Sequence, residues 1–196
     1  MLSALGEVPD PQIALQLLRH CVSFDKMVYS LRTVPSHFHK ESLREFDAAI
    51  RACFEQFTCL HPDDEQWRQA CLPTHQAGLG LRSAASHGDA AFLASRSSCL
   101  DLCREIDPLH CLDFTDGSLP APERLAFDAY NASVSDDYRL LASVSGPLSQ
   151  KRLSEGIDSR SFVALIQHCA SGAPFPSQTN KCDWRGRGTV LNERNE

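Results

Sequence analysis

The chain has 196 residues, of which 42% are hydrophobic and 22% are charged, a composition typical of a folded globular protein. Its net charge of −6 argues against a protein that binds nucleic acid through its overall charge. No stretch approaches the roughly 18 consecutive apolar residues of a membrane-spanning helix, and Glu7 and Pro9 interrupt the first apolar run too early for a signal peptide. We therefore expect a soluble intracellular protein, cytoplasmic or nuclear, with no membrane role, whose nine cysteines are free thiols.

Apolar residues in the first third of the chain recur at the three- and four-residue spacings of one helix face. Asp10 and Pro11 are suited to begin a helix, which we expect over residues 11–33, ended by Pro35. A second such pattern predicts a long helix that ends near Leu60. Its apolar face consists of Leu43, Phe46, Ile50, Phe54 and Phe57.

Three shorter helices are expected further along the chain. Asp63 is placed to cap one over residues 64–72. Apolar residues at three- and four-residue spacings predict another over residues 123–141. Asp158 is placed to cap a last helix over residues 159–170.

The stretch LPTHQAGLGLRSAASHGDAAFLAS, residues 72–95, combines the glycine density of a loop with the apolar residues of a helix. A phosphate-binding glycine loop would follow a buried strand, whereas the preceding element here is a predicted helix. We therefore interpret the stretch as a turn in which Gly78 and Gly80 allow positive φ or close packing. A helix starting at Ser83 is expected to follow and to run to about Ile106, with a glycine as its weak interior point.

These elements predict an all-α protein, an irregular bundle of about five to seven helices with a disordered C-terminal tail. We divide it into a helical region over residues 1–115, additional helices over 116–172 that follow a Pro- and Gly-containing linker, and a polar tail over 173–196. The expected core consists of Leu17, Cys21, Phe24, Val28, Phe46, Ile50, Phe54, Trp67 and Phe92.

The densest group of candidate metal ligands consists of Cys99, Cys103, His110 and Cys111. Cys99 and Cys103 share one face of a helix, but adjacent His and Cys side chains rarely reach one ion, and free cysteines are common in protein cores. We therefore predict no metal site and no cofactor, and leave open whether this group binds zinc.

Patterns of catalytic residues are also weak. The nine cysteines and eight histidines form many formal pairs, but none has the local pattern of a nucleophile and its base. The acid pairs Asp63–Asp64 and Asp136–Asp137 lie at predicted helix caps or surfaces, not on strands that would bring carboxylates to two metal ions. No catalytic residue is predicted from these patterns.

Three segments nevertheless follow one another in a distinctive order: LLRHCVSFDKMVYSLRTVP, LREFDAAIRACFEQF and WRQACLPTHQAGLGLRSAASHGDAAFLAS. This order resembles the region downstream of the catalytic palm in reverse transcriptases of non-LTR retrotransposons. The resemblance covers roughly residues 12–106, and LSQKRLSEGIDSRSFVALIQ continues it faintly. One departure is that the usual Gly-Gly pair is replaced by Ala77-Gly78.

The resemblance implies a helical thumb and linker region of an RNA-directed DNA polymerase. Such enzymes carry catalytic aspartates in an F/Y-x-D-D motif, which the sequence from Met1 to Glu196 does not contain. We therefore expect a chain that is catalytically inactive alone and that contacts RNA or DNA backbone through basic residues inside the similar segments: Lys26, Arg32 and Arg82. A solvated face is, however, the more common role of a Lys or Arg on an amphipathic helix.

Two further interpretations stay open. The bundle could serve as a protein-interaction module without a nucleic-acid role, with the remainder of a polymerase as one such partner. The chain could also be a remnant without a selected function. Neither composition nor pattern indicates an oligomeric state.

Overall fold

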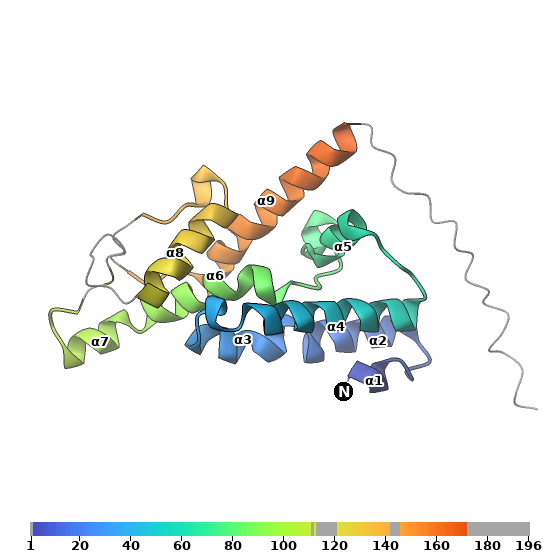
Figure 1. Ribbon diagram of the computed structural model, residues 1–196, viewed down its shortest axis with the longest axis horizontal. Coiled ribbons are helices and arrows are strands. Elements are labelled where there is room, and N and C mark those ends of the chain that lie inside the picture. Colours follow the sequence, from blue (N-terminus) through green and yellow to red (C-terminus); the bar gives the residue numbers. More distant parts are fainter. Residues whose placement is uncertain (1, 111, 113–120, 142–145, 172–196) are drawn as a thin grey trace, which may run out of the picture.

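The computed structural model describes residues 2–110, 112, 121–141 and 146–171, and helices dominate all of these ranges (Figure 1). No strand occurs in them, which confirms the all-α prediction. The described ranges contain eight α-helices of seven residues or more and a single-turn helix, slightly more than we expected. The predicted tail over 173–196 and most of the predicted linker lie outside the described residues.

The helices follow one another along the chain in numerical order. They are α1 (Leu2–Leu5), α2 (Pro11–Leu17), α3 (Phe24–Thr33), α4 (Lys40–Thr58), α5 (Asp64–Cys71), α6 (Ala84–Ser98), α7 (Leu100–Ile106), α8 (Ala121–Ser133) and α9 (Gln150–Ala170). Four short helical turns lie between them: the π-helical η1 (Leu18–Val22) and the 3-10 turns η2 (Ser36–Phe38), η3 (Thr74–Gln76) and η4 (Asp136–Tyr138).

Two predicted helix starts are confirmed in atomic detail. The carboxylate of Asp10 accepts a hydrogen bond from the backbone N–H of Gln12 at 2.8 Å, and Pro11 occupies the first turn of α2. At α5, Asp63 accepts from the N–H of Gln66 at 2.8 Å, and the Gln66 side chain accepts from the N–H of Asp63 at 3.1 Å. These reciprocal bonds form a capping box.

The helix expected over residues 11–33 is interrupted. Its middle is the wider π-helical turn η1, and Ser23 leaves the helical conformation while its hydroxyl donates to the carbonyl of Arg19 at 2.9 Å. A π turn holds more residues than an α turn, so it rotates the residues up to η1 relative to those of α3. The apolar residues on the two sides of this turn therefore do not share one helix face. For this reason Leu17 and Cys21, which we expected in the core, are exposed.

The helix expected over residues 83–106 is divided at Cys99 into α6 and α7. The one expected over 123–141 ends at Ser133, because the chain then folds back along α8. There the side chain of Asn131 accepts from the N–H of Leu140 at 2.8 Å and donates to its carbonyl at 3.3 Å. The three- and four-residue apolar spacing continues beyond Ser133 in the sequence, and for this reason it predicted a longer helix.

The last helix begins earlier than predicted. Ser149, not Asp158, is its N-cap, and α9 starts at Gln150. Asp158 lies in the middle of α9 and is buried. The prediction was wrong because the buried side of the first turns contains Ser154 and Gly156, small residues that leave no continuous apolar stripe.

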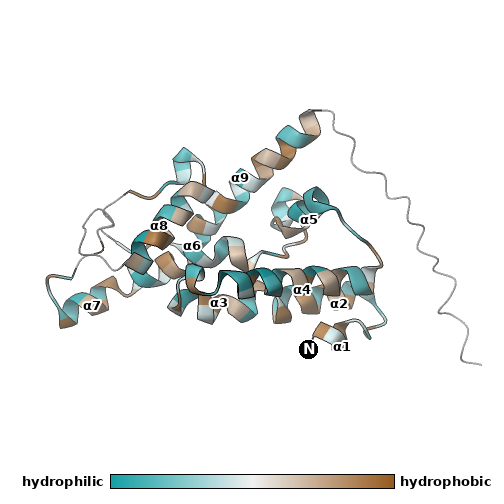
Figure 2. Ribbon diagram, viewed as in Figure 1, coloured by the Kyte–Doolittle hydropathy of each residue, from teal (hydrophilic) through white to brown (hydrophobic). Residues whose placement is uncertain are grey.

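The helix α6 lies at the centre of the fold, where it packs against α3, α4, α8 and α9 (Figure 1). Gly88 marks its closest approach to the segment before α4, since a Cβ at this position would lie 3.0 Å from the Cβ of Ser36. Figure 2 shows a different pattern on α4, whose visible face includes many hydrophilic residues. Thus α6 is covered by other helices, and α4 has a solvated side.

The buried apolar residues form three clusters. One joins α6 to α8 and α9, a second joins α1 and η1 to α4, and a third lies between α3, α4 and α6. Four of the expected core residues are buried, namely Phe24, Ile50, Phe54 and Phe92. Val28, Phe46 and Trp67 are partly buried and pack against these clusters.

Candidate functional site

The similar segments identified in the sequence meet at the beginning of α6. Asp47 of α4 accepts a hydrogen bond from the hydroxyl of Ser83 at 2.6 Å and from the N–H groups of Ala84 and Ala85 at 2.8 and 3.1 Å. A carboxylate at a helix N-terminus satisfies its free N–H groups and complements the helix dipole. The segment LREFDAAIR is therefore bound to the start of the helix that follows the glycine turn.

A second polar cluster joins α6 to α9. Asp158 faces Arg82 at 3.2 Å and the imidazole Nε2 of His87 at 3.1 Å. The other ring nitrogen of His87 lies 3.0 Å from the carbonyl of Ser83, so each nitrogen of the ring faces an acceptor. Burial alone raises the pKa of Asp158, but the hydrogen bonds and charges of His87 and Arg82 outweigh it and hold that pKa below its ordinary value.

This cluster accounts for Arg82, one of the three predicted nucleic-acid contacts. Its guanidinium lies over the ring of Phe24, 5.7 Å from the centroid, and so links α3 to the Asp158 cluster. The side chains of His87 and Asp158 are each only 5% exposed. A buried pair of this kind positions helices and is closed to a substrate.

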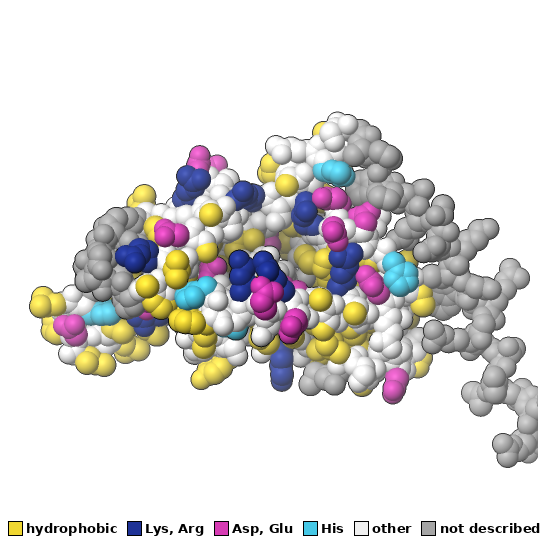
Figure 3. All heavy atoms as spheres, viewed as in Figure 1, with side chains coloured by type: hydrophobic (Ala, Val, Ile, Leu, Met, Phe, Trp, Pro, Cys, Tyr) yellow, Lys and Arg dark blue, Asp and Glu magenta, His cyan; other side chains and the backbone are white. Residues whose placement is uncertain are grey.

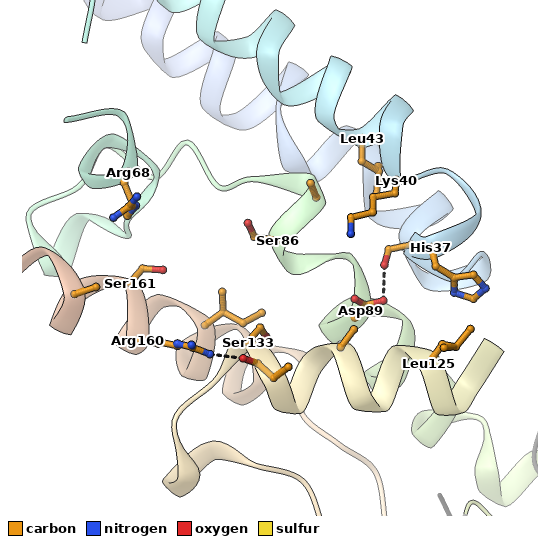
Figure 4. Close-up of a pocket in the computed structure, with 16 residues that line it drawn as sticks. His37, Lys40, Leu43, Arg68, Ser86, Asp89, Leu125, Ser133, Arg160 and Ser161 are labelled. Atoms are coloured by element: carbon orange, nitrogen blue, oxygen red, sulfur yellow. Dashed lines mark hydrogen bonds between the residues drawn. The ribbon is translucent and has the colours of Figure 1, made fainter. Parts of the chain in front are cut away.

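An open groove of about 560 Å³ lies between α4, α6, α8 and α9 (Figure 4). Its basic side chains come from separate elements: Lys40 from α4, Arg68 from α5 and Arg160 from α9. In Figure 4 the ammonium group of Lys40 and the hydroxyl group of Ser86 both point into the open space. The groove thus presents hydrogen-bond donors from several helices to one volume.

The charge of this groove is positive. Its acidic lining residue among the described ones is Asp89, which accepts a hydrogen bond from the hydroxyl of Ser36. Burial raises the pKa of Asp89, although the hydrogen bond from Ser36 and nearby basic groups including Lys40 oppose this. Arg160 donates to the backbone carbonyl of Ala132 at the edge of the groove.

The structure places the other predicted contacts outside this groove. Lys26 and Arg32 are exposed on α3. The guanidinium of Arg32 donates to the side-chain oxygen of Gln150 at 2.6 and 3.0 Å, which ties α3 to the start of α9. The three predicted residues therefore do not converge, and the groove was missed because its cations are far apart in sequence and form no local motif.

The densest cysteine group gives no metal centre in the described part of the chain. Cys99 is exposed and Cys103 is partly buried, while Cys111 lies outside the described residues. Within the described ranges no three His, Cys, Asp or Glu side chains are grouped so that they could hold a metal ion. Burial raises the pKa of the Cys71 thiol to about 12, which makes that cysteine a poor nucleophile at neutral pH.

The two acid pairs are surface features. Asp64 forms an ion pair with Arg51 at 2.8 Å, and the hydrogen bond from Arg51 lowers its pKa. Asp136 pairs with Arg139 at 2.9 Å on the surface. Neither pair lines the groove.

The described helices include none that combines the length and the apolar character needed to span a membrane. Comparison with known proteins gave no match among family models, curated proteins or solved structures.

Proposed function

We propose that the chain is a helical module derived from a non-LTR retrotransposon reverse transcriptase, inactive as a polymerase by itself, which contacts the backbone of a nucleic-acid strand. The order of the three similar sequence segments supports the origin. The hydrogen bonds that Asp47 accepts from the start of α6 are consistent with it, because they join residues of two of these segments.

The positive groove is the observation that carries the binding role. Phosphate oxygens accept hydrogen bonds from Lys, Arg and Ser side chains, and such contacts need no particular base sequence. Lys40, Arg160 and Ser86 supply these donors along one open groove. On the face shown in Figure 3, described basic side chains alternate with acidic ones, so the groove is a more specific candidate than the surface as a whole. Lys26 and Arg32 on the neighbouring α3, and Arg82 before α6, remain predicted contacts.

The test is the salt dependence of binding to a single-stranded RNA oligonucleotide, measured by fluorescence anisotropy. The variant Lys40→Ala/Arg160→Ala should bind more weakly. Its plot of log affinity against log salt should be less steep by about 1.4, since each phosphate contact to a single strand contributes about 0.7.

A matched control removes the same two charge types outside the groove, with Lys151→Ala/Arg139→Ala. This variant should keep both the affinity and the slope of the wild-type chain. Wild-type protein that fails to bind at low salt, or equal losses in both variants, would contradict the proposal.

A second candidate function is protein interaction, and the helix α7 favours it. Leu102 and Ile106 of α7 are 62% and 88% exposed and lie at the four-residue spacing of one helix face, and Leu109, in the turn that follows α7, is 89% exposed. Figure 3 shows hydrophobic side chains gathered at this end of the molecule. If this face binds a second copy of the chain, sedimentation should show association that depends on concentration and that Leu102→Ser/Ile106→Ser abolishes.

A further inference from the structure

A smaller pocket of about 350 Å³ lies where the glycine turn meets the break between η1 and α3. Two arginines and two histidines line it: Arg19, His20, His75 and Arg82. Asp25 is the acidic residue of the lining. Thr74 contributes a hydroxyl group. None of these residues lines the groove of Figure 4, so the two sites are separate.

The glycine turn shapes one wall of this pocket. Gly80 has a φ of 74°, a left-handed conformation that favours glycine. A Cβ at Gly80 would lie 2.8 Å from the Nε atom of Arg19, so the absent side chain is what allows this guanidinium to lie against the turn. Gly78 is required for another reason, because a Cβ there would overlap the carbonyl group of Leu72. The turn thus leaves room beside the pocket for the side chain of Arg19, which comes from η1.

Arg82 retains donors for a ligand although it pairs with Asp158. The hydrogen bond to Asp158 uses Nη2, and a guanidinium has five N–H donors in a planar fork. The Arg82 side chain is 33% exposed, whereas that of Asp158 is 5% exposed. Arg82 therefore contacts the buried Asp158 on one side and the solvent-accessible pocket on the other. The ion pair with Asp158 holds its guanidinium in place.

We propose that this pocket binds a phosphate group. Two guanidinium groups fit phosphate oxygens through paired hydrogen bonds, and imidazoles add donors when they are protonated. A volume of about 350 Å³ lies at the lower end of the range for ligand pockets and is sufficient for a phosphate with a small attached group. In this pocket side chains would hold the phosphate. In a phosphate-binding glycine loop, by contrast, backbone N–H groups at the start of a helix hold it. This proposal does not depend on strand binding in the groove.

Titration of the full chain with inorganic phosphate, followed by two-dimensional NMR of the backbone amides, tests the site directly. Sodium chloride at the same ionic strength is the reference. Phosphate should give saturable shifts at Arg19, Gly80 and Arg82. Arg19→Ala should weaken this binding about tenfold, the loss expected for one charge-assisted contact, and Arg19→Lys should restore part of it.

The control for charge is Arg44→Ala, which removes an exposed arginine of α4 that pairs with Glu41. It should bind phosphate as the wild type does. His75→Ala changes an exposed side chain of the turn and should weaken binding without loss of the fold, so the test does not depend on Arg19 alone. The absence of saturable shifts at the pocket, or unchanged affinity in both the Arg19→Ala and His75→Ala variants, would overturn the proposal.

The source of the phosphate is distinguished by two oligonucleotides of one sequence, with a 5′-phosphate or a 5′-hydroxyl group. Shifts at Arg19 and Gly80 that require the 5′-phosphate identify a strand terminus as a ligand. Shifts with inorganic phosphate alone identify a free phosphate site. The variant Lys40→Ala/Arg160→Ala should leave the shifts with inorganic phosphate unchanged, so failure of the groove and failure of this pocket give different outcomes.

Discussion

The helices α4 and α6 pack against each other but differ in how their residues are buried. In α4, four of 19 residues are buried, and they lie on one face: Leu43, Ile50, Cys53 and Phe54. In α6, nine of 15 residues are buried, and most of them are small: Ala84, His87, Gly88, Ala90, Ala91, Phe92, Leu93, Ala94 and Ser97. A helix at the surface separates apolar from polar faces, while a helix enclosed by others does not.

This difference explains why the stretch 72–95 has a loop-like composition although much of it is helical. Small residues let neighbouring helices approach α6 closely on several sides, and the same small residues imitate loop composition. Asp47 accepts hydrogen bonds at the start of α6, and Asp158 from α9 pairs with its buried His87. The position of α6 therefore depends on packing and on two carboxylates supplied by other helices.

The largest effect is expected at the carboxylate that joins α9 to α6. Asp158→Ala leaves His87 buried without its acceptor and removes the ion pair of Arg82. We expect a loss of about 3 kcal/mol in the free energy of unfolding, at the lower end for broken buried pairs because Arg82 can gain water. Urea denaturation measures it, with Glu155→Ala on the exposed side of α9 as a control. Equal stability of the two variants would mean that the cluster does not fix α6.

The same substitution on the two helices tests the comparison itself. Ala90 of α6 is fully buried, whereas Ala48 of α4 is exposed. Ala90→Leu should overpack the core and cost about 2 kcal/mol, while Ala48→Leu should change stability by less than about 0.5 kcal/mol. Thermal unfolding of both variants measures this contrast. Similar melting temperatures would show that α6 is less enclosed than the structure indicates.

A smaller effect is expected where α4 caps α6. Asp47→Ala removes three hydrogen bonds at the start of α6 and should destabilise the fold by about 1 to 2 kcal/mol, the upper part of the range for a lost cap. Glu45→Ala removes an exposed acid of the same helix and is the control. Amide hydrogen exchange should become faster in the first turn of α6 with the former variant alone.

The smallest effect concerns acid pH. Because the pKa of Asp158 is lowered in the folded protein, its ionised form contributes stability above about pH 4, the ordinary range of an aspartate. This contribution is lost as pH falls through the lowered pKa. Burial raises the pKa of Asp89, which therefore acts in the opposite sense. The wild type should lose more stability than Asp158→Asn between pH 5 and pH 3, and parallel curves would contradict this.

Much of the fold could be predicted from local chemistry. The caps at Asp10 and Asp63 and the apolar face of α4 depend on residues within a few positions of one another. The breaks at Ser23 and Ser133 could not be predicted, because a continuous apolar spacing runs across both. The same holds for the start of α9, where packing against α6 replaces an apolar stripe.

The candidate sites show the same limit more clearly. Arg82 was selected from a motif, and its pairing with Asp158 could not be foreseen because the two residues are far apart in sequence. Lys40 and Arg160 meet at one groove only through the arrangement of α4 and α9. No local pattern marks such cations, since each alone is typical of a solvated helix face.

The sequence by itself determined that the chain is all-α, where several helices begin, and that Gly78 and Gly80 make a turn. These properties follow from interactions between near neighbours, which composition and spacing record directly. Only the tertiary structure decided that α6 is central, that Asp47 and Asp158 are structural acids, and where basic side chains converge. Those properties depend on contacts between distant segments, and the physical reason is that burial and charge pairing are set by packing.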